Sequence, residues 1–69
     1  MDLTESQSRV LLFIEDYIDS MGFPPTRSEI AGGLGFASSY SSHCHLIKLQ
    51  EKGVISLFPK VSRGIKLTN

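Results

Sequence analysis

The sequence predicts a mainly α-helical fold with a small β-hairpin, the winged helix-turn-helix arrangement of three helices and a two-stranded antiparallel wing. Two segments of capping-box form, Thr4 to Gln7 and Thr26 to Glu29, each precede apolar residues at helical spacing. A turn at Gly35 then separates the second helical segment from a third. Apolar and polar residues alternate close to the C-terminus, which is typical of β-strands.

Length and composition favour one folded domain over residues 1–69. Of the 69 residues, 41% are hydrophobic and 20% are charged, and Cys44 is the single cysteine. Such a balance is typical of globular chains rather than disordered ones. No apolar run approaches the ~20 residues of a membrane span, and the first residues show no basic region of a secretory signal. We therefore expect a cytoplasmic protein with no membrane partner and no internal disulfide.

Positive charge is concentrated in the second half of the chain, although the net charge is +0. Residues 1–34 have a charge balance of −4 and residues 35–69 a balance of +4. A polyanion is therefore expected to meet the C-terminal half. The alternative is chance segregation of charge in a short chain.

The first helix is expected from about Glu5 to Met21. Thr4 and Gln7 cap its start, and Gly22 suits its C-terminal end because φ is often positive there. Two prolines follow and prevent continuation. The signal for this helix is a set of apolar residues that recur three and four positions apart: Val10, Leu11, Phe13, Ile14, Tyr17, Ile18 and Met21.

A second helix is expected from about Arg27 to Leu34, with Ile30, Ala31 and Leu34 facing inward. Gly32 and Gly33 lie within it, and they either allow a close approach of helices or weaken the element. A turn at Gly35 follows, and Phe36 is expected to close the core beneath that turn.

The third helix is expected to begin near Ser38 or Ser39, either of which can cap it. Lys52 and Gly53 close it. Its inward stripe is predicted to comprise Ser42, Leu46 and Leu49, with His45 at the edge. Ile47 lies off this stripe and is expected on a wet face.

The wing is expected to comprise a strand at Val54–Phe58, a turn at Pro59–Ser62 and a return strand at Arg63–Leu67. A two-stranded hairpin is unstable alone, so it must pack against the helices. In a winged helix-turn-helix, the third helix of such a chain enters the major groove of DNA.

Three separated blocks of the sequence, PPTRSEIAGGLGF, HLIKLQEKGVI and SRGIKL, resemble the N-terminal DNA-binding domain of the LexA family of SOS repressors. The blocks agree with that family in order and spacing, and the resemblance runs from Leu3 to Leu67. It implies a domain that binds double-stranded DNA sequence-specifically and represses DNA-damage genes. It also implies palindromic operators bound by a dimer on the bacterial nucleoid.

The sequence departs from the family in two respects. Full-length members continue into a self-cleaving domain with a Ser-Lys dyad, which also supplies most of the dimer contact. The 69 residues do not include it, so we expect a non-enzyme that is either a fragment or a stand-alone regulator of phage or plasmid type. The best-known enterobacterial members carry asparagine and glutamates where this chain has Tyr40, His43 and Cys44, so we expect a different operator.

The outward start of the third helix is the predicted base-reading surface, because the N-terminal turns of a recognition helix reach base edges. The predicted base-reading residues are Ser38, Tyr40, Ser41, His43 and Cys44. Basic side chains and helix N-termini are expected to bind phosphates. The predicted phosphate-binding residues are Thr26, Arg27, Ser28, Ser39, Lys48, Lys52, Lys60 and Arg63. For each of them the alternative is a solvated polar side chain.

The sequence does not favour a metal site or an active site. Consecutive helical residues are rotated ~100° apart, so His43, Cys44 and His45 cannot converge on one ion. No phosphate loop or nucleotide fingerprint is present. We expect no metal, no cofactor, no small-molecule ligand and no catalytic residue.

Two other functions are alternatives to DNA binding. A protein-docking module would use Tyr40, Ile47 and Phe58 as contacts, and the positive C-terminal half argues against it. An RNA-binding module lacks the aromatic stacking platform that such proteins use.

Overall fold

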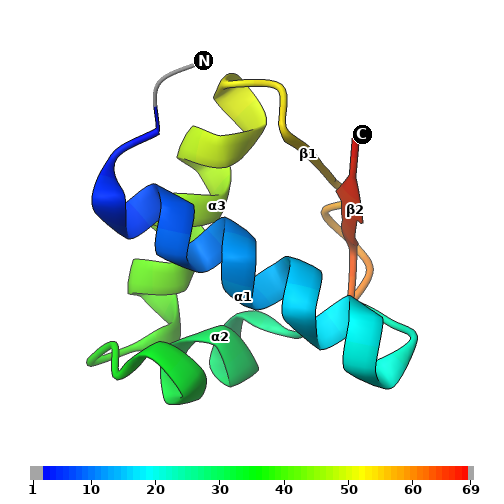
Figure 1. The fold of residues 1–69 in the computed structure, drawn as a ribbon, viewed down its shortest axis with the longest axis horizontal. Coiled ribbons are helices and arrows are strands. Elements are labelled where there is room, and N and C mark those ends of the chain that lie inside the picture. Colours follow the sequence, from blue (N-terminus) through cyan, green and yellow to red (C-terminus); the bar gives the residue numbers. More distant parts are fainter. Residues whose placement is uncertain (1–2, 69) are drawn as a thin grey trace.

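The computed structural model describes residues 3–68 and forms three helices followed by a β-hairpin (Figure 1). The helices are α1 (Glu5–Met21), α2 (Arg27–Leu34) and α3 (Ser39–Glu51). Strands β1 (Ile55–Leu57) and β2 (Ile65–Leu67) form an antiparallel pair at one side of the helices. This is the predicted winged helix-turn-helix; residues 1, 2 and 69 of the expected domain lie outside the described residues.

The caps predicted for α1 and α2 are confirmed. The Thr4 hydroxyl accepts from the Gln7 amide at 3.1 Å, and Oε1 of Gln7 accepts from the Thr4 amide at 3.1 Å. Thr26 and Glu29 repeat this pairing at 3.1 and 2.8 Å. Both helices therefore begin and end at the predicted residues, and the glycines that follow them have positive φ angles of 84° and 75°.

The inner side of α3 is part of the hydrophobic core, as predicted. Ser42, Leu46 and Leu49 are 0%, 2% and 0% exposed. They lie in a core that α1, α2 and the wing also line, with Val10, Ile14, Ile30, Ile55 and Ile65 as its other large buried residues. The Ser42 hydroxyl has no hydrogen-bond partner among residues 3–68. Burial of this stripe fixes which side of α3 faces out.

Met21 belongs to the apolar residues at helical spacing on α1, but its side chain is 56% exposed. Met21 is the last residue of α1, and the chain turns at Gly22, so no following helical turn covers it.

Both strands are shorter than predicted. The ladder pairs Ile55 with Leu67 and Leu57 with Ile65. Beyond it, the Phe58 amide donates to the Gly64 carbonyl oxygen at 2.8 Å and continues the pairing by one bond. A turn follows, held by backbone bonds from the Val61 amide to the Phe58 carbonyl at 3.2 Å and from the Gly64 amide to the Val61 carbonyl at 3.1 Å. The turn therefore takes up more of the wing than the four residues predicted.

Of the paired glycines in α2, one allows a close contact between helices. A Cβ atom at Gly33 would collide with the ring of Phe13 on α1, whereas a Cβ atom at Gly32 would meet nothing within 4 Å. The close approach predicted as one alternative therefore applies to Gly33 alone.

We expect Gly32→Ala and Gly33→Ala to have different effects on stability. The first should raise the free energy of unfolding by ~0.5–1 kcal/mol, because alanine is the better helix former. The second gains the same helix propensity but must displace the Phe13 ring, so it should be ~1–3 kcal/mol less stable than the first. Urea unfolding followed by circular dichroism measures both. Equal stability of the two variants would contradict the close contact.

Candidate nucleic-acid interface

The outward side of α3 carries the predicted base-reading residues. Tyr40 is 71% exposed, Cys44 is exposed, and Ser41 and His43 are half-buried. Ser38 is exposed just before the first turn. The structure thus gathers all five on the first two turns of one helix, on the sides that the buried stripe leaves uncovered.

Ser38 is the N-cap residue of α3, but its hydroxyl makes no capping hydrogen bond. Instead, the Ser41 amide donates to the Ser38 carbonyl oxygen at 3.2 Å. The side-chain cap predicted at Ser38 or Ser39 is therefore wrong. The N-cap of α3 thus differs from Thr4 and Thr26, whose hydroxyls accept from amides of α1 and α2.

Tyr40 lies beside two other predicted base readers. Its ring centroid is 6.3 Å from that of His43. A hydrogen bond with the Cys44 side chain raises the pKa of Tyr40 above its ordinary value. Tyr40 therefore keeps its hydroxyl proton at neutral pH and can both donate and accept a hydrogen bond.

The two histidines of α3 have different neighbours. Nη1 of Arg27, at the start of α2, lies 3.1 Å from Nδ1 of His43. His45 instead donates from Nδ1 to the Ser41 carbonyl oxygen at 2.7 Å and stacks on Phe36, with ring centroids 5.0 Å apart. Phe36 thus covers the edge of α3 as well as packing on the core. Within the described range, no three His, Cys, Asp or Glu residues are placed to share a metal ion.

Six of the predicted phosphate-binding residues lie at the starts of α2 and α3, on the outer part of α3 or on the wing. Arg27, Ser28, Ser39, Lys48 and Lys60 are exposed. Lys48 also lies 3.6 Å from the Glu51 carboxylate, an exposed pair that costs little to separate. The Thr26 hydroxyl accepts from the Glu29 amide, so its first role is to cap α2.

Lys52 and Arg63 have partners within the protein. Nζ of Lys52 donates to Oε1 of Gln7 at 2.8 Å, which joins the end of α3 to the start of α1. Arg63 leaves the wing and reaches α2 and the segment before it. The phosphate contacts predicted for these two residues gain no support from this geometry.

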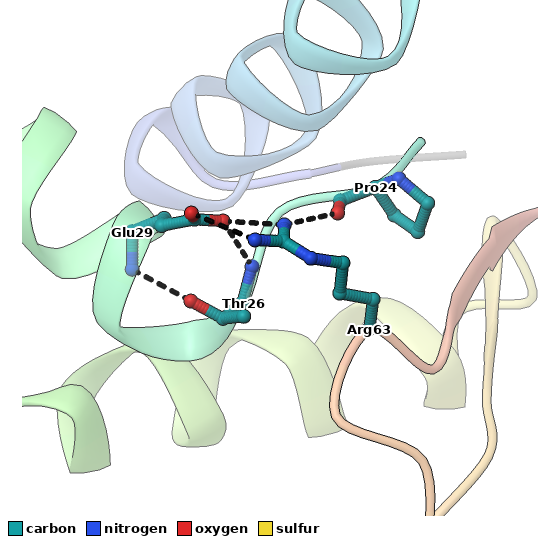
Figure 2. A network of polar contacts seen from close by, with 4 residues as sticks. All are labelled: Pro24, Thr26, Glu29 and Arg63. Atoms are coloured by element: carbon teal, nitrogen blue, oxygen red, sulfur yellow. Dashed lines mark hydrogen bonds and ion pairs between the residues drawn. The ribbon is translucent and has the colours of Figure 1, made fainter. Parts of the chain in front are cut away.

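Arg63 donates to the Glu29 carboxylate from both terminal guanidinium nitrogens, Nη1 and Nη2, at 2.7 and 3.0 Å (Figure 2). Nη1 also donates to the Pro24 carbonyl oxygen at 2.9 Å, and the guanidinium lies 4.8 Å from the centre of the Phe23 ring. One arginine therefore joins the wing to α2 and to the connection after α1. The sequence shows Glu29 as a helix cap; nothing in it indicates a partner 34 residues away.

A hollow of about 260 Å³ lies between α3 and the wing. Ile47, Leu57, Phe58 and Val61 line its apolar part, and Arg27 and His43 line its polar part. The solvent-exposed position predicted for Ile47 is therefore wrong. Its side chain is half-buried, because the wing folds back beside α3.

Comparison with known proteins agrees with this geometry. The model of the family described as "LexA DNA binding domain" matches residues 1–64. The chain belongs to the LexA DNA-binding domain family. It is 51% identical over 67 residues to the LexA repressor of Marinobacter nauticus, covering 97% of this chain and 33% of that protein.

Other LexA repressors are similarly close. The chain is 51% identical over 65 residues to the repressor of Idiomarina loihiensis, covering 94% of this chain and 32% of that protein. It is 46% identical over 67 residues to that of Cellvibrio japonicus, covering 97% and 34% respectively. The chain thus spans about a third of the length of these curated relatives. Over residues 3–68, this LexA-family domain has no helix with the length and hydropathy needed to cross a membrane.

We expect the bond between Glu29 and Arg63 to make stability depend on pH. The Arg63 guanidinium, and then the Thr26 amide, lower the pKa of Glu29 from 4.5 to about 2. Because the folded pKa lies below the unfolded one, this stabilisation is complete above the ordinary value of 4.5 and is lost as the pH falls towards about 2.

Glu29→Gln should therefore be less stable than the wild type at neutral pH, and the two should converge as the pH falls towards about 2. Urea midpoints measured across this range test the prediction. Glu15→Gln, on the exposed side of α1, is the control for loss of one carboxylate. A difference between Glu29→Gln and the wild type that is constant with pH would contradict it.

Proposed function

We propose that this chain is the DNA-binding part of a LexA-type transcriptional repressor and reads a specific double-stranded operator through α3. The observation that carries the proposal is the outward side of α3, where Tyr40, Ser41, His43 and Cys44 flank an inner stripe that is buried. Membership of the LexA DNA-binding domain family supports DNA as the partner. The proposed cellular site is the cytoplasm, on the bacterial nucleoid.

In this proposal α3 enters the major groove and the wing lies over the neighbouring backbone. Ser38, Tyr40, Ser41, His43 and Cys44 face base edges. The exposed side chains of Arg27, Ser28, Ser39, Lys48 and Lys60 approach phosphates, and the uncapped start of α3 offers its amides to the same backbone. Thr26 joins them as the capping residue of α2. Lys52 and Arg63 instead hold the elements in position.

Binding as a dimer is the second part of the proposal. One module of this kind buries only ~600–1,000 Å² on DNA, so a single copy binds weakly. Two copies on the half-sites of a palindrome, about one helical turn apart, gain affinity by acting together. The dimer contact and the regulation of DNA-damage genes are proposed by analogy with full-length LexA repressors.

Selection from a pool of random duplexes tests the proposal. We expect the chain to enrich one motif, and paired copies of that motif about one turn apart to bind more tightly than a single copy. The selection should be run at about 0.1 M salt, where non-specific phosphate contacts are already weakened. Binding to all duplexes alike would overturn sequence-specific recognition.

The protein-docking alternative is favoured by one observation, the apolar hollow that Ile47 and Phe58 line beside α3. Two results together would favour this alternative over DNA binding. The chain would retain a partner protein from nuclease-treated lysate and lose it on Phe58→Ala, and the duplex selection would enrich no motif.

We expect Tyr40→Ala and Lys48→Ala to separate base reading from phosphate binding. Tyr40→Ala should cost ~1–3 kcal/mol on the selected operator and relax preference at the base pairs it faces, since a base contact is lost. Lys48→Ala should weaken binding to all duplexes alike and lower the salt slope by about one, because a phosphate contact is lost. Titrations of selected and scrambled duplexes at several salt concentrations measure both. The same pattern in both variants would refute these roles.

A further inference from the structure

The contact between Arg27 and His43 constrains how α3 reads DNA. Arg27 stands at the start of α2 and His43 on the second turn of α3, 16 residues later, with Nη1 and Nδ1 3.1 Å apart. The contact joins the two helices of the helix-turn-helix unit at its outer edge. It therefore acts on a predicted base-reading side chain rather than on the core.

The chemistry of the two groups fixes the position of the ring proton. A guanidinium carries N–H donors only and cannot accept a hydrogen bond. Nδ1 of His43 must therefore be the acceptor, with a free lone pair. A neutral imidazole with its lone pair on Nδ1 carries its proton on Nε2. In this arrangement the one polar group that His43 still offers is a donor.

We propose that Arg27 holds His43 as the Nε2–H tautomer, so that His43 donates to a guanine in the major groove of the operator. This inference rests on the proposed function. Guanine presents two acceptors in the major groove, N7 and O6, with no donor between them. Cytosine presents only a donor, so a side chain restricted to donation discriminates against it. Adenine and thymine each present a single acceptor, N7 beside a donor and O4 respectively, against the two adjacent acceptors of guanine.

The hydroxyl-bearing residues among the other predicted base readers are not restricted to one hydrogen-bonding role, donor or acceptor. The hydroxyls of Ser38, Tyr40 and Ser41 rotate and can donate or accept, so they fit more than one base. His43 is the residue of this set whose role is fixed by a neighbouring cation. Arg27 is therefore a positioning residue for His43, and its remaining N–H groups stay available for phosphate.

The ring proton can be tested without DNA. In ¹⁵N NMR of the 69-residue chain, His43 should show the neutral pattern with the proton on Nε2. His45 serves as the internal comparison, because its Nδ1 donates to a carbonyl oxygen and must carry a proton. Arg27→Ala should abolish the single-tautomer pattern of His43 and leave that of His45 unchanged. A His43 ring protonated on Nδ1 in the wild type would overturn the inference.

The base can be tested by repeating the duplex selection with variants at position 43. The wild type should prefer guanine at one position of each half-site, by roughly three- to tenfold over cytosine and by less over adenine and thymine. His43→Glu, which can only accept, should move that preference to cytosine, and His43→Gln, which donates and accepts, should move it to adenine. Arg27→Ala should weaken all binding and also reduce the guanine preference at that one position by about threefold or more.

These outcomes separate the inference from the function on which it rests. No motif enriched by the wild type would mean that the proposed function has failed. If the wild type and His43→Glu enrich the same motif, sequence-specific DNA binding stands and the proposed role of His43 is overturned. Loss of guanine preference in His43→Glu but not in Arg27→Ala would overturn the positioning role of Arg27.

Discussion

Burial of one stripe of α3 is the constraint on which the rest of the structure depends. Ser42, Leu46 and Leu49 are almost fully covered by the core. Because side chains on a helix lie at fixed angles around its axis, covering this stripe leaves Tyr40 and Cys44 outside. The hydrophobic effect thus orients the surface proposed to read bases, although none of those residues contributes much to the core.

The second constraint is electrostatic and acts on the wing. A hairpin of two three-residue strands cannot hold its own position. Arg63 joins it to the Glu29 carboxylate and the Pro24 carbonyl, and thereby joins residues far apart in the chain. One carboxylate then serves two purposes, since Glu29 also caps α2. The charge of Arg63 thereby holds the wing against α2.

A hydrogen bond between exposed side chains of α2 and α3 also affects the proposed DNA-binding surface. Arg27 and His43 meet only because α2 and α3 cross at their outer edge. Either residue alone is a common surface side chain, and their contact determines which ring nitrogen of His43 carries the proton. In the proposed mode of DNA binding, specificity therefore depends on contacts between elements as well as on the sequence of α3.

The sequence by itself determined the helices, the caps of α1 and α2, and the inner stripe of α3, because these depend on neighbours three or four residues apart. It also determined the family, through blocks that span nearly the whole chain. The tertiary structure decided what depends on distant partners. It gave Lys52 and Arg63 partners on α1 and α2, placed Ile47 beside the wing, left Met21 outside and brought Arg27 to His43. Charge and periodicity show that a residue can make a contact, but only the fold brings its partner within ~3 Å.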